Sequence, residues 1–271
     1  MEGSTLLTSG LGLFVGLVLA LTGAGGAIIA VPLLVFGLHL GLAQAGPVGL
    51  LAVALAATLG AALGWRAGLL RYKAAALMAS AGLLTSAPGL WLAQRIPNAP
   101  LTALFALVLG AVAWRMFAQA SRELRGVVVS ARVTPSPCRL DPAQGKLHWN
   151  WACARSLLLA GGAAGFLSGL LGVGGGFVLV PTLLATSDLP MKAVVATSMG
   201  VLAVISAGGV LNASLTGQMT WAVAWPFAAG ALVGLLGGHL FAQRLAGPRL
   251  QQGFAALAAA IAVGLLARAT T

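Results

Sequence analysis

The chain consists of long apolar segments separated by short polar connections. The apolar segments fall at about 5–23, 25–41, 47–64, 74–93, 100–117, 155–172, 174–187, 192–213, 222–242 and 250–267. A helix needs about 17–25 residues to cross the hydrocarbon layer of a membrane, so the pattern predicts an all-α polytopic membrane protein with about ten hydrophobic segments. The segments at 25–41 and 174–187 are short and open in glycines. Each is expected to be a short span, a broken helix or a re-entrant hairpin.

One polar stretch interrupts this pattern. Residues 118–153 combine several arginines with Pro135, Pro137 and Pro142, a composition typical of a linker. We therefore expect three regions, namely a first transmembrane repeat at 1–117, a polar basic linker at 118–153 and a second transmembrane repeat at 154–271.

The two halves on either side of this linker resemble each other. The run LTGAGGAIIAVPLL, from Leu21 to Leu34, aligns without a gap with LLGVGGGFVLVPTL, from Leu170 to Leu183. In the same register, Ala93-Gln94-Arg95 meets Ala242-Gln243-Arg244. Self-similarity at a fixed separation is the signature of an internal repeat, so we interpret the chain as a duplication.

The charges in the loops indicate how the two repeats are oriented. The positive-inside rule places Arg66, Arg71, Lys73 and the basic linker in the cytoplasm. With five spans per repeat, every basic residue except Arg95 and Arg268 falls on that side, whereas four spans per repeat leave more of them outside. Five spans invert the second copy, so we favour two inverted five-segment repeats with broken Gly/Pro helices. Such an arrangement is typical of transporters, whose substrate site lies at the repeat interface.

Composition supports a membrane protein and excludes several other classes. Of the 271 residues, 59% are hydrophobic and 7% are charged, whereas a soluble domain carries about a quarter charged residues. This excludes a soluble enzyme, a disordered chain and a nucleic-acid-binding module. The net charge of +11 follows from the positive-inside rule rather than from nucleic-acid binding. We expect a multi-pass protein of the plasma (inner) membrane, surrounded by the lipid bilayer, with its central basic loop in the cytoplasm.

The two cysteines of the chain, Cys138 and Cys153, lie in or beside the basic linker. A cytoplasmic loop is kept in reducing conditions. We therefore predict that both cysteines are free thiols.

The paired glycine segments are the strongest candidates for a substrate site. Glycine permits backbone bends that other residues resist, and a helix N-terminus after such a bend offers unpaired N–H groups and partial positive charge to an anion. A proline that follows in the helix lacks an N–H and leaves a carbonyl one turn earlier unpaired. Close packing by small residues is the alternative interpretation. The candidate residues are Gly25, Gly26, Pro32, Gly174, Gly175, Gly176 and Pro181.

Hydroxyl and ionisable side chains supply further candidates. Thr197 and Ser198 open the segment after the second glycine run, where they could bond an anion, cap the helix or bond back to a carbonyl. The first half has Val48 and Gly49 at the matching positions, so a hydroxyl contact would be one-sided. Accessory candidates are His39 and Asp188, beside the membrane surface, and Asn212 and His239, in apolar segments.

Several kinds of chemistry are missing from the sequence. No series of acids runs through the apolar segments, and no metal-ligand cluster or Ser/His/Asp set is present. We therefore expect no enzyme activity, no catalytic residue, no cofactor, no metal site and no nucleic-acid partner. A transporter of a small anionic substrate is favoured, and an interior-negative potential would expel a monovalent anion with about 2.3 kcal/mol per 100 mV. An anion channel and a non-transport membrane scaffold or assembly factor are the alternatives.

The paired segments resemble the TauE/SafE family, also called the 4-toluene sulfonate uptake permease family. The resemblance rests on LTGAGGAIIAVPLLV in the first half, and on LLGVGGGFVLVPTLL followed by LPMKAVVATSMG in the second. It covers nearly the whole chain apart from the linker. It implies a plasma-membrane transporter of sulfite, an organosulfonate or a related sulfur oxyanion. The interior-negative potential makes export the expected direction. The resemblance also implies that Gly25, Gly26, Gly174, Gly175, Thr197 and Ser198 lie near the substrate.

Overall fold

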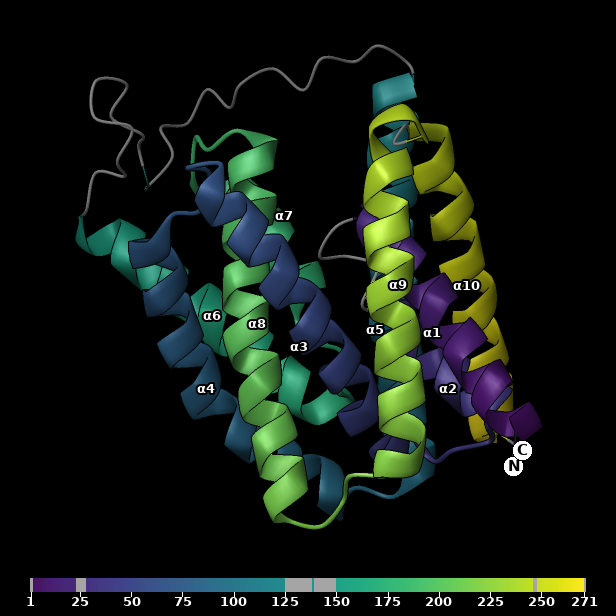
Figure 1. Cartoon of the computed structure of the whole chain (residues 1–271). Helices are drawn as coiled ribbons and strands as arrows, with labels where there is room; N and C mark the ends of the chain where they lie inside the picture. The colour runs from purple at the N-terminus through teal and green to yellow at the C-terminus, as the bar shows by residue number, and fades with distance from the viewer. Residues whose placement is uncertain (1, 23–27, 125–137, 139–149, 246–247, 271) are drawn as a thin grey trace.

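Ten helices make up the part of the chain that the computed structural model describes, which comprises residues 2–22, 28–124, 138, 150–245 and 248–270 (Figure 1). Each helix coincides with one predicted apolar segment, although α3 and α6 begin earlier and α5 ends later than predicted. The helices are α1 (Glu2–Thr22), α2 (Ala30–Gly37), α3 (Leu42–Arg66), α4 (Tyr72–Arg95), α5 (Asn98–Leu124), α6 (Trp151–Leu171), α7 (Gly176–Thr186), α8 (Met191–Leu215), α9 (Trp221–Leu245) and α10 (Pro248–Thr270).

Six of the described helices are long and apolar enough to cross a membrane. They are α3, α4, α6 and α8 over their full lengths, α5 over Asn98–Arg122 and α9 over Trp221–Gly238. Shorter apolar stretches occur in α1, α7 and α10. Large apolar side chains such as Leu84, Trp114 and Val263 are exposed on the outside, which suits a surface that faces lipid rather than water. The predicted all-α polytopic membrane protein is therefore confirmed.

The largest helix–helix interfaces join the two halves of the chain. α1 packs on α9, α4 on α6, α3 on α8 and α5 on α10. Each helix of the first half has a counterpart five places later in the second half, so that α1 corresponds to α6 and α4 to α9. When counterparts are exchanged, the α1–α9 pair becomes the α6–α4 pair, and the α3–α8 and α5–α10 pairs are unchanged. Several smaller contacts follow the same exchange, with α4–α8 matching α9–α3 and α2–α3 matching α7–α8.

Glycines let two of these pairs approach closely. In the α4–α6 pair, a Cβ added to Gly165 would collide with the backbone of Gly82. In the α1–α9 pair, a Cβ added to Gly16 would collide with the backbone of Ala231. Without a side chain between them, the helices gain van der Waals contacts along their backbones, which is the usual way in which membrane helices associate.

The direction of α3 and α8 sets the faces of the protein. Gly64, near the end of α3, lies at Ala196, near the start of α8, whereas Leu50 of α3 lies at Gly209 of α8. The two helices are therefore antiparallel, and the end of α3 and the start of α8 share one side of the protein. We call this side the basic face, because Arg66, Arg71 and Lys73 lie at or beside the connection between α3 and α4.

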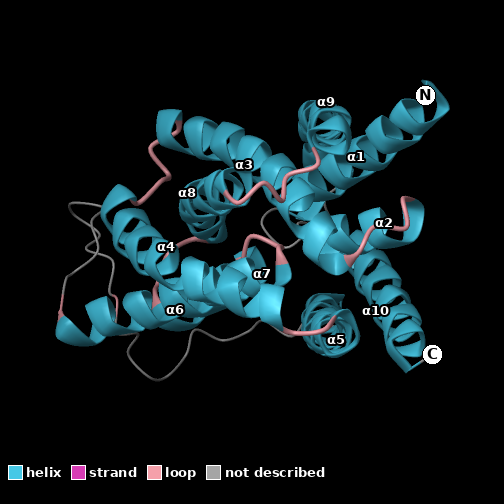
Figure 2. Ribbon diagram, turned by 90° about the horizontal axis from the view of Figure 1, so that it is seen from below, coloured by secondary structure: helices cyan, strands magenta, loops and turns pink. Residues whose placement is uncertain are grey.

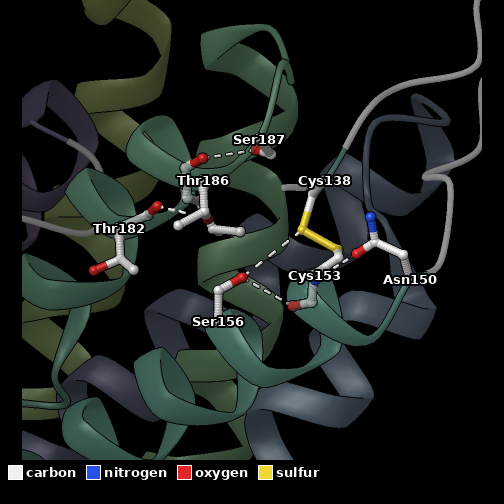
Figure 3. Close-up of a disulfide and its surroundings, with 8 residues drawn as sticks. Cys138, Asn150, Cys153, Ser156, Thr182, Thr186 and Ser187 are labelled. Carbon is white, nitrogen blue, oxygen red and sulfur yellow. Dashed lines mark hydrogen bonds between the residues drawn. A yellow bond between two sulfur atoms is a disulfide. The ribbon is translucent and has the colours of Figure 1, made fainter. Parts of the chain in front are cut away.

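A disulfide joins Cys138, beside the end of α7, to Cys153, near the start of α6. The Cys138 N–H donates to the Thr186 carbonyl at 3.0 Å, and the Cys138 carbonyl accepts from the Asp188 N–H at 3.4 Å. These bonds hold Cys138 beside Cys153, with 4.8 Å between the Cα atoms, and the two side chains form a disulfide (Figure 3). The prediction of free thiols is therefore wrong. It was argued from the compartment alone, whereas the pairing depends on Cys138 lying against the end of α7.

Candidate anion site

The second glycine run forms a tight turn between α6 and α7. Gly172 follows the last residue of α6 with φ +69°, and Gly174 and Gly175 follow with φ +77° and +71°. This left-handed backbone region is costly for any residue with a Cβ. α7 then begins at Gly176, and no side chain caps its first N–H groups. The glycines therefore place an uncapped helix N-terminus, with its partial positive charge, inside the protein.

Three helices enclose this N-terminus. A Cβ on Gly174 would lie 3.0 Å from Val53 Cγ1 of α3, 3.1 Å from Leu202 Cδ2 of α8 and 3.1 Å from Ser206 Oγ of α8. A Cβ on Gly175 would collide with the Ala164 carbonyl of α6. Seen along the helices in Figure 2, α7 lies between α6 on one side and α3 and α8 on the other. The predicted residues Gly174, Gly175 and Gly176 thus come together in one buried turn.

Thr197 and Ser198 are both fully buried, but the structure gives them different surroundings. Thr197 Oγ1 accepts a hydrogen bond of 3.1 Å from the backbone N–H of Arg71. It therefore fixes the connection between α3 and α4 at the basic face. Ser198 Oγ has no hydrogen-bond partner. Of the two predicted hydroxyls, that of Thr197 has a protein partner, whereas that of Ser198 has none.

Ser206 is a site hydroxyl that sequence reasoning missed. Its side chain is fully buried, its Oγ has no hydrogen-bond partner, and that atom faces Gly174. Helical hydroxyls ordinarily donate to a carbonyl three or four residues earlier, as Ser214 does to Val210 at 2.7 Å. The signal in the sequence is the spacing, because positions 198, 202 and 206 recur every four residues and share one face of α8.

The two predicted prolines lie in the short helices rather than in the turn. Pro32 is buried in α2, and Pro181 is half-buried inside α7, which continues through it. Pro181 has no N–H to donate to the carbonyl of Phe177, one turn earlier. Gly25 and Gly26, together with the side chain of His239, lie outside the described residues. The counterpart of the turn in the first half is therefore not part of the site as described.

The other accessory candidates lie away from the turn. His39 follows α2, is exposed and has φ +54°, the one positive φ of a non-glycine residue in the described ranges. Asp188 is exposed after α7, where its N–H bonds to Cys138. Asn212 is half-buried near the end of α8. None of these three is brought to Gly174.

Two hollows lie on the opposite side from the basic face. A cavity of about 20 Å³ adjoins Gly46 and Gly172 and is also lined by Gln94 and Gln218, and this volume has room for about one water molecule. A wider groove of about 470 Å³ lies between the ends of α4 and α8. The groove is lined by Ala87, Pro88, Leu90, Trp91, Gln94, Asn212 and Thr216.

The chain is similar to known membrane proteins along almost its whole length. The family model for the sulfite exporter TauE/SafE matches residues 8–265. A Xylella fastidiosa (strain Temecula1) protein named "Probable membrane transporter protein" is 29% identical over 272 residues, which cover 98% of this chain and 96% of that protein. A probable membrane transporter protein of Methanocaldococcus jannaschii is 47% identical over 55 residues, or 20% of each chain. No solved structure matches.

Proposed function

Because the chain belongs to the sulfite exporter TauE/SafE family of membrane transporters, we propose that it exports a small sulfur oxyanion, either sulfite or an organosulfonate. The observation that carries this proposal is the uncapped N-terminus of α7, buried beside the unpartnered hydroxyl of Ser206. The anion would be held by the backbone N–H groups at Gly174, Gly175 and Gly176. Thr197, which was a candidate ligand, would act instead through its bond to Arg71.

The chemistry of the turn favours an anion. Backbone N–H groups at a helix N-terminus bind oxyanions without a neighbouring charged side chain, and hydrogen bonds to an ionised acceptor are stronger than neutral ones. The segments α3, α6, α7 and α8 contain no Asp or Glu. A cation would therefore find no carboxylate at this depth, whereas an anion would find several donors.

The helix contacts support a transporter built from two inverted five-segment repeats. The four largest interfaces map onto themselves when the halves are exchanged, and the equivalent helices α3 and α8 are antiparallel. The site would then lie at the interface between repeats, where such transporters hold their substrates. The cavity beside Gly172 holds about one water molecule, and the turn that follows is buried. Entry of a larger ion would therefore require the helices around the turn to separate. We infer alternating exposure of the site to the two sides of the membrane.

The loop charges support an orientation in the plasma membrane with the basic face in the cytoplasm. In that orientation, an interior-negative potential drives a monovalent anion outward with about 2.3 kcal/mol per 100 mV. Export would then need no coupling ion.

The proposal is tested by sulfite efflux from proteoliposomes that contain the purified protein. We expect flux that saturates with sulfite concentration and accelerates under an interior-negative potential, and a Gly175→Leu variant without flux, because its side chain would meet the Ala164 carbonyl. Flux that does not saturate would indicate a channel. A protein that moves neither sulfite nor an organosulfonate would overturn the substrate, and flux that follows only a pH gradient would overturn the driving force.

A further inference from the structure

Three buried side-chain atoms lack a hydrogen-bond partner in the described part of the chain. Two belong to α8, and the third belongs to Arg71, whose backbone N–H bonds to Thr197 of α8. They are Arg71 Nε, Ser198 Oγ and Ser206 Oγ. Burying a polar group without a partner is costly, and such groups are rare in native structures. Their collection along one helix calls for a common explanation.

The three groups follow one another along α8. Ser198 and Ser206 are two helical turns apart, or about 12 Å along the axis. Leu202 lies between them on the same face and contacts Gly174, so this face is turned toward the start of α7. Arg71 is held near the start of α8, because its backbone N–H bonds to Thr197, the residue next to Ser198. The series therefore leads from the basic face to the α7 N-terminus.

The two serines differ from other hydroxyls in the same environment. Ser214, also on α8, donates to Val210 at 2.7 Å, and Thr182 on α7 donates to Val178 at 2.7 Å. Bonding back in this way satisfies a hydroxyl inside a membrane helix. Ser198 and Ser206 do not make this bond, although each is fully buried. Their donors are thus left for another acceptor.

The chemistry of the series selects the ligand. A guanidinium group only donates, and its planar fork matches the oxygens of an oxyanion. The helices that carry or flank the three groups, α3, α4 and α8, contain no Asp or Glu that could pair with Arg71 from within them. Donors of this kind select a small oxyanion rather than a cation or an apolar molecule.

We propose that Arg71, Ser198 and Ser206 form a track of donors along α8, on which the oxyanion passes between the basic face and the N-terminus of α7. Arg71 attracts the anion at the basic face, Ser198 is the next contact, and Ser206 completes the site at Gly174. This inference rests on the proposed function. It adds two residues, Arg71 and Ser206, to those that the sequence singled out.

The serines are tested with Ser198→Ala, Ser206→Ala and the matched control Ser214→Ala in sulfite flux and thermal melting. We expect both track variants to raise the KM for sulfite on the order of ten-fold, since each removes a hydrogen bond to a charged ligand, while Ser214→Ala keeps the wild-type KM. Melting temperatures of the track variants should not fall, because no protein partner loses a bond. A wild-type KM in Ser206→Ala, or a raised KM accompanied by lower melting, would overturn the track.

Arg71 is tested by Arg71→Gln against Arg66→Gln, a change at an exposed residue near the same connection. We expect Arg71→Gln alone to slow sulfite flux at low ionic strength, with less difference at high salt, where screening weakens the attraction of Arg71 for the anion. Equal fluxes of the two variants would contradict a role for Arg71 in the track.

A binding measurement separates this inference from the proposed function. Sulfite, thiosulfate, sulfate and phosphate are each added to the purified full-length protein, and the rise in melting temperature is recorded. If another oxyanion stabilises the wild-type protein but not Ser206→Ala, the track stands and the sulfur substrate is wrong. If sulfite stabilises and is transported by both proteins equally, the proposed function stands and the track is wrong. If no oxyanion stabilises the wild-type protein, both are wrong.

Discussion

The α4–α6 interface and the α6–α7 turn share a helix and are both rich in glycine, yet glycine serves different purposes in them. At the interface, Gly165 has ordinary helical backbone and faces the backbone of Gly82, so the absence of a side chain allows contact between the helices. In the turn, Gly174 has φ +77° and faces Ser206 Oγ. The interface is formed by backbone atoms in the middle of regular helices, whereas the turn is bordered by a hydroxyl that lacks a hydrogen-bond partner.

This difference shows what distinguishes a site from close packing in a chain with 38 glycines. Glycine alone does not mark a site, because small residues are the usual means of helix association in membranes. The turn is distinguished by positive φ values, an uncapped helix N-terminus and an unpartnered buried hydroxyl. Substitutions by alanine can measure each of these properties separately.

The largest effect is expected from Gly165→Ala. Its Cβ would collide with the backbone of Gly82, so α4 and α6 must move apart along their length, and we expect a loss of about 3 kcal/mol in stability. Gly162→Ala on the same helix is the control, since its Cβ would meet only Thr85 Cγ2 at 3.6 Å. This control should gain up to about 1 kcal/mol from helix propensity. Thermal melting in detergent that shows the same change for both variants would refute the close packing of this interface.

An intermediate effect on stability, with a large effect on transport, is expected from Gly174→Ala. The left-handed backbone costs about 1–2 kcal/mol for alanine, and the Cβ would lie 3.0–3.1 Å from Val53, Leu202 and Ser206. Gly217→Ala has nearly the same φ, +71°, with nothing within 4 Å of its Cβ. Both variants should melt at lower temperature, but only Gly174→Ala should lose sulfite flux. Equal flux in the two would remove the turn from the substrate path.

The smallest effect is expected from Thr197→Val. The Arg71 N–H would lose its 3.1 Å bond, and an unpaired amide of this kind costs about 1 kcal/mol. We expect a slightly lower melting temperature with little change in the KM for sulfite, in contrast to Ser198→Ala. A KM that rises as much in Thr197→Val as in Ser198→Ala would restore Thr197 as a direct ligand.

The sequence predicted the helices well because the length of an apolar run is set by the membrane rather than by packing details. The ten expected segments match the ten described helices. The ends were less accurate, since α5 continues to Leu124 through polar residues such as Gln119 and Arg122. These residues favour a helix but do not suit a membrane interior, so hydropathy alone ended the segment early.

The candidate site was predicted in part, and the limits have a physical cause. The turn at Gly174 follows from local backbone preference, which a short stretch of sequence reveals. The partner of a hydroxyl depends on residues far away in the chain. Thr197 Oγ1 accepts a hydrogen bond from the backbone N–H of Arg71, and Ser206 Oγ faces the turn between α6 and α7. The disulfide was missed for the same reason, because Cys138 is positioned by Thr186 and Asp188.

The disulfide allows the orientation of the transporter in the membrane to be determined by chemical labelling. The positive-inside rule assigns the linker that contains Cys138 to the cytoplasm, where thiols are kept reduced, whereas a disulfide persists on the oxidising side of a membrane. Figure 1 shows both termini at the end of the protein away from the last turn of α7, beside which the disulfide lies. The oxidation state of this cysteine pair therefore indicates on which side of the membrane each end of the protein lies. The test is maleimide labelling of the two cysteines in intact cells. Labelling that occurs only after reduction would show that the basic face lies outside. The anion path from Arg71 would then begin outside the cell.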